Sequence, residues 1–378
     1  MYEQQIQGDL LYMMLYGAVA MMSLMASCYL LFRRANAIAP DVTSSVRLRR
    51  WTAVFFVCMT LSHLWYLPIA FFTSCEDIMQ GYLVGALLDF MLLIPSAIVL
   101  LLVMLQDRRR PLWPVCLMVA PPIVGLAIGF ASRSIARLPL FYTYHLLLGI
   151  GLSIYMVREV RRYGRWLRDN YADLEHKEVW QSLIVLAIIL LVFGIYSFGV
   201  KGITYHYVIQ VNDIFLICYL LWRVETLSDL SISRPQDLSE EADDSLAIQT
   251  GTTENEDDNA KSLSIRNIGL LLKQQCEEPQ LYLQHDISVT QLAILIGTNR
   301  VYQSQYFTNQ GINYNTYING LRIQHFINLY QEATKSHQTI ITKLLAYQSG
   351  FRSYSTFSAA FKQTMGMTAT EWMRNQAE

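Results

Sequence analysis

Seven long apolar stretches fill most of residues 1–222 and limit what this chain can fold into. Each holds roughly 18 to 25 mostly apolar residues, the length with which an α-helix crosses the hydrocarbon core of a bilayer. In lipid, every backbone polar group must be satisfied within the chain, so such stretches form helices. They cover residues 10–32, 51–72, 82–105, 111–130, 138–157, 180–200 and 205–222. The sequence therefore predicts an all-α protein with a seven-helix transmembrane bundle.

Composition supports this prediction, because the chain of 378 residues is 53% hydrophobic and only 16% charged, far from the average soluble protein. We expect the first stretch to remain as a membrane span rather than to be cleaved as a signal peptide. It is preceded by the acidic residues Glu3 and Asp9 instead of basic ones, and its apolar run is longer than that of a signal peptide.

The basic residues predict the orientation of the bundle, because Lys and Arg accumulate in cytoplasmic loops. Fourteen of them follow the first, third and fifth stretches, whereas the alternate loops hold three. The fourteen are Arg33, Arg34, Arg47, Arg49, Arg50, Arg108, Arg109, Arg110, Arg158, Arg161, Arg162, Arg165, Arg168 and Lys177, and the three are Arg133, Arg137 and Lys201. This distribution predicts an N-terminus outside the cell and a C-terminus in the cytoplasm.

Ionisable or amide side chains lie inside several of the apolar stretches. They are His63, Asp89, His145, Asn212 and Asp213, with His206 near the end of a stretch. Such groups are costly in hydrocarbon and usually face the interior of a helix bundle. With the predicted orientation, all of them fall in the middle or outer half of their helices, which predicts a polar ligand pocket that opens outward. The alternative, in which each is only an interhelical hydrogen-bond partner, stays open.

Neither a metal site nor an enzyme active site is indicated by the sequence. The six cysteines, at positions 28, 58, 75, 116, 218 and 276, have no paired spacing, so neither a disulfide framework nor a zinc site is expected. The chain also lacks the HExxH, GxSxG and GxxxxGK[ST] motifs. We therefore predict a protein that is not an enzyme and that carries no cofactor.

An acidic segment separates the apolar region from the C-terminal part of the chain. Lys plus Arg against Asp plus Glu number 17 and 13 in residues 1–222, 3 and 11 in 223–262, and 9 and 6 in 263–378. A polar, acidic segment with few aromatic residues cannot bury enough apolar surface to order itself. The sequence thus predicts a transmembrane sensor domain over 1–222, a disordered linker over 223–262 and a third domain over 263–378.

The third domain contains one short phrase twice, LAILIG at 292–297 and LAYQSG at 345–350. In the first copy, Ser288 and Gln291 have the spacing of a capping box at a helix start. Gly297 and Gly350 each suit the left-handed conformation that ends a helix. Asn299 is then placed to cap a second short helix, so each phrase predicts a helix-turn-helix unit.

Several further features lie before, between and after the two phrases in a recognisable order. They are a first helix from Ile265 to about Gln275, the segment GINYNTYINGLRI at 311–323, and STFSAAFKQTMGMT at 355–368 followed by a closing tryptophan, Trp372. In this order the segment resembles the DNA-binding module of AraC/XylS-type transcription regulators, and especially the variant at the end of bacterial membrane-sensor regulators. The resemblance covers about 110 residues.

The resemblance implies that a long helix, from about Asn315 to Ala333, joins the two helix-turn-helix units. It also implies that the second helix of each unit enters a major groove of double-stranded DNA. By position, the residues implied to face DNA are Arg300, Val301, Ser304 and Gln305 in the first unit, and Arg352, Tyr354, Ser355 and Lys362 in the second. Taken together with the predicted spans and their orientation, it predicts a multi-pass protein of the bacterial cytoplasmic (inner) membrane, with the N-terminus outside and the DNA-binding domain in the cytoplasm.

Four positions depart from the family's pattern. Gln305 and Ala359 stand where family members commonly have arginine, Gln303 stands where a leucine packs inward, and Ala369 replaces a usual proline. From the counts above, the net charge of residues 263–378 is 9 minus 6, or +3, which is modest for a protein that binds duplex DNA.

Two function hypotheses follow. In the first, the chain is a membrane-anchored one-component transcription regulator, in which an unknown signal ligand acts on the transmembrane bundle and alters sequence-specific DNA binding. A monomer with two helix-turn-helix units can occupy DNA, but a homodimer would gain from effective concentration. In the second, the chain is a membrane receptor or transporter whose degenerate helix-turn-helix tail binds a protein partner.

Overall fold

The computed structural model describes residues 10–111, 113–132, 138–181, 183–185, 187–188, 203–230 and 267–377. Within these ranges the regular secondary structure is helical, and the only β pairing is two isolated bridges. The all-α prediction is thus confirmed. The described residues divide into two compact units, one within Met1–Tyr163 and Glu178–Ser231 and the other within Gly164–Lys177 and Ile232–Glu378. We call them the N-terminal unit and the C-terminal unit.

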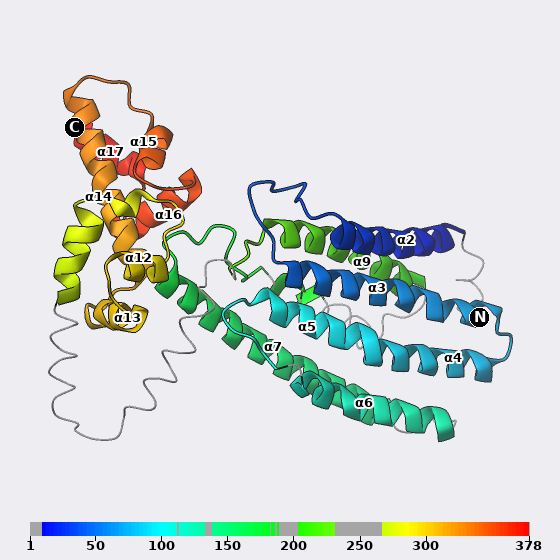
Figure 1. Cartoon of the computed structure of the whole chain (residues 1–378). Helices are drawn as coiled ribbons and strands as arrows, with labels where there is room; N and C mark the ends of the chain where they lie inside the picture. The colour runs from blue at the N-terminus through cyan, green and yellow to red at the C-terminus, as the bar shows by residue number, and fades with distance from the viewer. Residues whose placement is uncertain are drawn as a thin grey trace, which may run out of the picture. The chain divides into compact units, whose positions relative to one another are not determined.

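The N-terminal unit contains long apolar helices (Figure 1). They are α2 (Leu10–Phe32), α3 (Val46–Tyr66) with the 3₁₀ turn η1 (Leu67–Phe71), α4 (Cys75–Leu88), the π-turn η2 (Asp89–Leu93), α5 (Ile94–Met104), α6 (Trp113–Ser132), the first part of α7 (Leu138–Asn170) and α9 (Ile203–Thr226). Helices α2, α3 and α9 lie side by side, and α5 packs against α3.

Four helical stretches of this unit are long and apolar enough to cross a membrane: Leu10–Phe32, Val46–Phe71, Cys75–Met104 and Thr204–Thr226. They correspond to the first, second, third and seventh predicted spans. Trp113–Gly125 is a shorter apolar helix at the fourth, and the fifth forms the N-terminal part of α7. Most of the sixth, 180–200, lies outside the described residues. The number of seven spans stays a prediction.

Small hydroxyl residues hold α2 close to α3. Ser23 and Thr60 share a hydrogen bond of 2.7 Å between their hydroxyl oxygens, and the hydroxyl of Ser27 donates to the carbonyl of Ala53 at 3.1 Å. Side chains of this kind occur where transmembrane helices approach closely. In the third stretch, Pro95 follows the π-turn η2, in which the N–H of Ile94 bonds the carbonyl of Asp89. Such turns adjust a helix around a proline that cannot donate a hydrogen bond.

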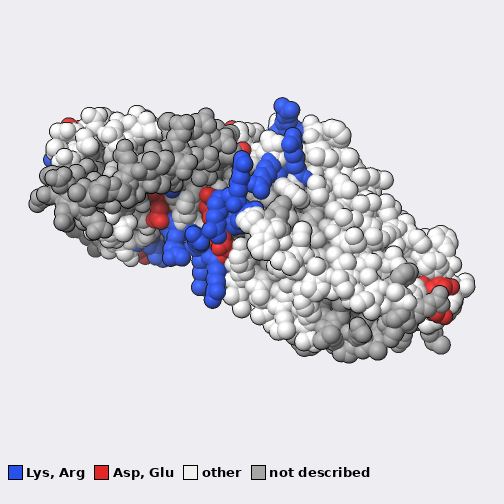
Figure 2. Space-filling model, turned by 60° about the horizontal axis from the view of Figure 1, so that its bottom comes forward, with Lys and Arg blue, Asp and Glu red and all other residues white. Residues whose placement is uncertain are grey.

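One end of the N-terminal unit is tied together by charged groups. The carboxylate of Glu159 accepts hydrogen bonds from Arg108 at 2.9 Å and Arg110 at 2.7 Å, and both guanidinium groups come from the loop that follows the third stretch. On the face drawn in Figure 2, Lys and Arg gather in a band beside a broad surface on which charged side chains are few.

The same unit orders the first residues of the segment that composition assigns to the linker. Helix α9 continues to Thr226, and the carboxylate of Glu225 accepts hydrogen bonds from the backbone N–H groups of Ala37 (3.0 Å) and Ile38 (2.7 Å). The N–H of Asp229 donates to the carbonyl of Thr43 at 2.8 Å. Residues 223–230 are therefore part of the N-terminal unit, because these contacts satisfy their polar groups. The rest of the predicted linker, 231–262, lies outside the described residues.

The C-terminal unit contains short helices arranged around one long helix, α14 (Tyr314–Lys335). Residues 267–272 are helical and lead into the π-turn η3 (Lys273–Glu277). The other elements are η4 (Leu281–Leu283), α12 (Val289–Leu295), α13 (Arg300–Asn309), α15 (Thr342–Gln348), α16 (Tyr354–Met365) and α17 (Ala369–Ala377). The observed α14 is two residues longer at its C-terminal end and one at its N-terminal end than the predicted linking helix.

Helix α14 contributes to two separate hydrophobic cores. Its first half places Tyr314 and Ile318 in a core with α12 and α13, and its second half places Phe326 and Tyr330 in a core with α15, α16 and α17. The closing residue Trp372 belongs to the second core. One helix thus holds two helix-turn-helix units in one compact unit.

Candidate nucleic-acid interface

The first helix-turn-helix unit is built as its local sequence predicts. The backbone N–H of Gln291 donates to the Ser288 hydroxyl at 3.2 Å, and the Gln291 side chain accepts from the N–H of Ser288 at 2.9 Å, which completes the capping box. Gly297 ends α12 with φ +70°. The side chain of Asn299 then caps α13 by accepting from the N–H of Val301 at 2.8 Å. These three predictions are confirmed.

Helix α13 presents one exposed face and one buried face. Its exposed side chains include all four that the resemblance implies for DNA: Arg300, Val301, Ser304 and Gln305. Val301 is 63% exposed, although it is apolar. A methyl-bearing side chain in that position suits contact with the methyl group of thymine. The buried face carries Phe307, which packs into the first core.

The second unit has the same order of elements. Gly350 ends α15 with φ +87°, and Ser353 caps α16, since its hydroxyl accepts from the N–H of Thr356 at 3.2 Å. Tyr354, Ser355 and Lys362 are exposed on α16. Phe357 and Phe361 point inward to Phe326 of α14. The exposed side chains of α16 are thus held on a rigid aromatic core.

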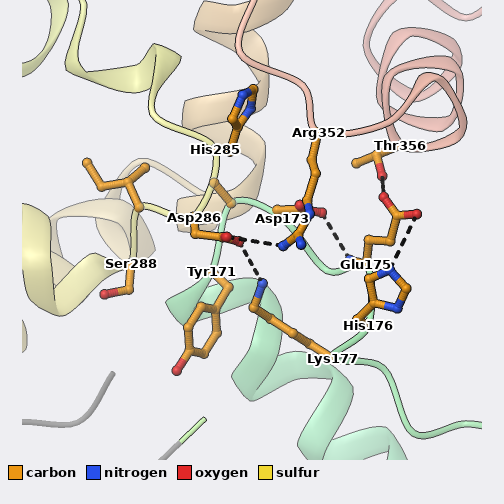
Figure 3. Close-up of polar contacts among 12 residues, drawn as sticks. Tyr171, Asp173, Glu175, His176, Lys177, His285, Asp286, Ser288, Arg352 and Thr356 are labelled. Carbon is orange, nitrogen blue, oxygen red and sulfur yellow. Dashed lines mark hydrogen bonds and ion pairs between the residues drawn. The ribbon is translucent and has the colours of Figure 1, made fainter. Parts of the chain in front are cut away.

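Arg352 is half-buried and differs from the other implied DNA contacts. Its Nη1 atom lies 3.1 Å from a carboxylate oxygen of Asp286, whose other oxygen lies 3.1 Å from the ammonium nitrogen of Lys177. Figure 3 shows Asp286 between these two cations. Burial works to raise the pKa of Asp286, but the charge and hydrogen bond of Lys177 and the charge of Arg352 hold that pKa below its ordinary value.

Gln303 is buried at the position where the family commonly has leucine. It has no exposed surface, and neither its amide oxygen nor its amide nitrogen has a hydrogen-bond partner among the described residues. An unpaired polar group in a core costs about 1–3 kcal/mol. The departure from the family pattern therefore weakens the first unit's core while it leaves the exposed face of α13 in place.

Arg322 has a structural role that the sequence did not reveal. It is fully buried, and its guanidinium donates to the carbonyls of Tyr282 (2.8 Å), Gln284 (2.6 Å) and His285 (3.2 Å). It also lies over the ring of Phe351, 5.7 Å from the centroid. This arginine therefore joins α14 to the loop before the first unit and to the turn of the second. No local pattern distinguishes it from an exposed helical arginine.

The predicted ligand-pocket residues lie in the N-terminal unit, and the structure brings part of them together. His63 is buried, and its Nε2 lies 3.2 Å from the side-chain oxygen of Gln210 and 3.9 Å from a carboxylate oxygen of Asp213. Asp89 accepts a hydrogen bond of 2.8 Å from the hydroxyl of Tyr66. Asn212 is partly exposed on α9, and the side chain of His145 on α7 lies outside the description.

His63 and Asp89 are hydrogen-bonded within this unit, and neither they nor Asn212 and Asp213 line either of two cavities found among the described residues. One cavity lies between η1 and α4 and is lined by Trp65, Phe72, Gln80 and neighbouring residues. The buried amide of Gln80 and the indole nitrogen of Trp65 have no hydrogen-bond partner in the described part of the chain. Ligand binding by the five residues stays a prediction.

Comparisons with known proteins agree with the geometry of the C-terminal unit. A family model described as a helix-turn-helix domain matches residues 281–375. The TCP pilus virulence regulatory protein of Vibrio cholerae serotype O1, in a classical Ogawa strain and in an El Tor Inaba strain, is 34% identical over 76 residues. This match covers 20% of the present chain and 26% of that protein. No solved structure matches the chain.

The present chain thus spans about a quarter of the length of these curated relatives. Both comparisons fall on the part of the chain that forms the two helix-turn-helix units, and they support a DNA-binding transcription regulator as its class. Residues 281–375 form an AraC-type helix-turn-helix module.

Proposed function

We propose that this chain is a membrane-anchored one-component transcription regulator, which binds specific DNA sequences through its C-terminal module and responds to a signal through its N-terminal unit. One observation carries the proposal. The second helix of each helix-turn-helix unit exposes the side chains implied to contact DNA, with the exception of Arg352, which precedes α16 and is half-buried, and α14 holds both helices in one compact unit. Two recognition helices that are held by one linking helix are suited to bind in two consecutive major grooves of DNA.

The side chains implied to contact DNA have the chemistry of base and phosphate recognition. Arg300, Arg352 and Lys362 suit the acceptor atoms of guanine or the phosphate backbone, and Gln305 suits adenine. Exposed Ser304, Tyr354 and Ser355 add hydroxyl groups that donate to phosphate oxygens. With few cations, this interface depends on direct contacts from a small number of residues more than on general attraction to DNA.

Membrane anchoring rests on the four long apolar helices. Helix α2 exposes large apolar side chains along its length, among them Leu10, Met14 and Met25. Apolar surface of this extent is unfavourable in water and suits contact with lipid. Together with the basic loops, it supports an N-terminus outside the bacterial inner membrane and a cytoplasmic C-terminal module. The signal ligand is proposed to act on the polar residues of the bundle, and a homodimer would raise DNA affinity by effective concentration.

The test uses the full-length chain purified in detergent micelles. DNA duplexes are enriched from a random library by the chain itself, and binding is measured against unrelated competitor DNA at several salt concentrations. We expect selective binding that the double substitution Arg300→Ala with Lys362→Ala lowers by tenfold or more, since each contact contributes roughly 1–3 kcal/mol. The double substitution Lys335→Ala with Lys343→Ala removes two positive charges from exposed positions on α14 and α15, outside both recognition helices, and serves as the charge-matched control.

The alternative function, a receptor or transporter whose tail binds a protein, gives the opposite result. In that case unrelated competitor DNA abolishes any preference of the chain for the enriched duplex. The variants Arg300→Ala and Arg352→Ala then leave the protein's role in cells unchanged. Asp89→Asn or Asp213→Asn would then abolish that role. A regulator-type helix-turn-helix module is not catalytic, so neither function assigns a chemical reaction to this module.

A further inference from the structure

A short segment that follows α7 lies on the helix-turn-helix module. It comprises residues 171–177, which we call the strap, and it belongs to the C-terminal unit together with residues 164–170. Figure 3 shows the strap beside the turn that precedes α12 and the start of α16. Its hydrogen bonds with Asp286, Asn315 and Thr356 join residues more than 100 positions apart, so these contacts are a property of the fold and not of local sequence.

The backbone of the strap is bound to the first helix-turn-helix unit. Tyr171 forms an isolated antiparallel bridge with Ser288, the N-cap of α12. The side-chain amide of Asn315 donates to the carbonyl of Ala172 at 2.6 Å, and that of Asn319 donates to the same carbonyl at 3.3 Å. Ala172 itself is fully buried and forms part of the first hydrophobic core. The strap is therefore packed into the module and is not merely adjacent to it.

The C-terminal end of the strap is held by an ion pair. Lys177 is only 6% exposed, and its ammonium group pairs with Asp286 at 3.1 Å. The same carboxylate pairs with Arg352 at 3.1 Å. A buried ammonium group without its carboxylate would be strongly unfavourable. Asp286 thus fixes the strap and, at the same time, holds an arginine that the proposed function assigns to DNA.

The strap also places a carboxylate at the start of the second recognition helix. The hydroxyl of Thr356, in the first turn of α16, lies 3.4 Å from a carboxylate oxygen of Glu175. The N-terminus of a helix carries partial positive charge and favours anions. A DNA phosphate approaching this turn would have to replace the Glu175 carboxylate there.

We propose that the strap is an intramolecular competitor of DNA, and that the second helix-turn-helix unit binds DNA fully only after Glu175 leaves Thr356 and Asp286 releases Arg352. The proposal rests on the proposed function and names how that function is regulated. The polypeptide chain links the strap to the N-terminal unit, on which the signal is proposed to act. Residues 164–177, which end with the strap, are preceded by Tyr163 and followed by Glu178, and both of these residues belong to the N-terminal unit. A rearrangement of the N-terminal helices is therefore transmitted to both ends of the strap.

The regulation is an equilibrium between a bound and a released strap. A signal shifts it only to the extent that the N-terminal unit, with the signal bound, favours one of these two states. DNA shifts the same equilibrium toward release, because it competes for the second unit. A substitution that weakens the bound strap therefore strengthens DNA binding, by at most the factor by which it raises the ratio of released to bound strap.

The test measures DNA affinity of the full-length chain in micelles, with a duplex enriched from a random library by that chain. Glu175→Gln removes the carboxylate charge at α16, and Asn315→Ala removes the hydrogen bonds to the strap's carbonyls. Each is expected to lower the Kd by about fivefold or more, the lower end of ordinary coupling between sites. Glu178→Gln is the matched control, because it makes the same chemical change at an exposed carboxylate just past the strap, and it should leave the Kd unchanged.

Hydrogen–deuterium exchange of the same protein gives a readout that does not depend on affinity. Amides of residues 171–177 should exchange slowly in the free chain and faster when the enriched duplex is bound. Unchanged protection on DNA binding, or a Kd that neither Glu175→Gln nor Asn315→Ala lowers, contradicts the strap as a competitor. A chain that binds no duplex selectively in any of these variants contradicts the proposed function itself, and the two failures are thus distinguished.

Discussion

The guanidinium of Arg352 lies 3.1 Å from the carboxylate of Asp286, so an arginine expected at the DNA is paired with an acid of its own module. The second oxygen of that carboxylate binds Lys177, which is nearly buried. A single acidic side chain therefore couples the position of the strap to the availability of a DNA contact.

Asp286→Asn tests this coupling. The substitution keeps the shape of the side chain but removes the charge that compensates Lys177, so the strap is expected to detach and Arg352 to become available. DNA affinity should rise by about fivefold or more, and the amides of residues 171–177 should lose protection in hydrogen exchange. Glu332→Gln, an equivalent change at an exposed residue of α14, is the control. A weaker affinity for the enriched duplex would show that Asp286 supports DNA binding rather than opposing it.

The substitution Asp173→Asn is expected to have the opposite effect, which is a more firmly bound strap and weaker DNA binding. Asp173 is 2% exposed, and one carboxylate oxygen has no hydrogen-bond partner among the described residues. Burial raises the pKa of Asp173, and Asp286 and Glu175 add to this, while Lys177 and the N–H of Glu175 offset it only in part. Arg322 is a further charged group nearby, and its charge is stabilised by Asp173. Because the pKa is raised in the bound strap, ionised Asp173 weakens the contact overall.

The sign of the pH dependence follows from this raised pKa. The bound strap takes up a proton between the ordinary pKa of an aspartate, about 3.9, and the raised pKa of Asp173, so the contact is strongest at low pH and weakens as pH rises through that window. Asp286, whose pKa is lowered, titrates below the window and acts there as a constant charge. Asp173→Asn should therefore slow exchange of the strap and weaken DNA binding at neutral pH. Faster exchange in this variant would mean that the charge of Asp173 stabilises the strap.

Gln303→Leu should stabilise the first helix-turn-helix unit. Leucine fills a similar volume and removes two buried polar atoms that lack partners, so the free energy of opening this unit should rise by about 1–3 kcal/mol. Hydrogen exchange of the buried amides of α12 and α13 measures that free energy directly. Gln305→Leu makes the same change on the exposed face of the same helix and should leave it nearly unchanged. Equal effects of the two substitutions would show that Gln303 is not strained by burial.

Gly350→Ala should disrupt the second unit more than Gly297→Ala disrupts the first. Both glycines have positive φ, where alanine costs about 1–2 kcal/mol. At Gly350 an added Cβ would also lie 2.7 Å from the Cα of Leu283, whereas at Gly297 nothing lies within 4 Å. Protease resistance of the full-length chain should therefore fall further for Gly350→Ala. A similar loss in both variants would mean that the backbone near Leu283 can move away without cost.

Local rules predicted the helix-turn-helix units well. The capping box of Ser288 and Gln291, the cap at Asn299 and the glycine ends of α12 and α15 all depend on residues within a few positions of one another. These features depend on short-range hydrogen bonds and on local backbone conformation, which a short stretch of sequence specifies. The bounds of α14, which the family resemblance implied, agree with the structure to within two residues at each end.

Long-range contacts could not be predicted in this way. Lys177 and Asp286 are 109 positions apart, and nothing in the basic loop after α7 distinguishes a lysine that pairs with the module from one that faces solvent. The contacts of Arg322 could not be predicted for the same reason, because the backbone carbonyl of Gln284, to which it donates, is 38 positions away in the sequence. In the N-terminal unit, the pairing of His63 with Gln210 depends on which helices are neighbours, and hydropathy does not specify this order.

The central claim is that a membrane-anchored chain occupies specific DNA sites through α13 and α16. Genome-wide DNA occupancy of the tagged full-length chain in its native cells, with the tagged chain recovered in the membrane fraction, tests this claim most directly. We predict occupied sites that share a motif of two half-sites about one helical turn, or roughly 10 base pairs, apart, and that the Arg300→Ala with Lys362→Ala variant loses. Occupied sites with no common motif, or the same sites in the double variant, would contradict the account.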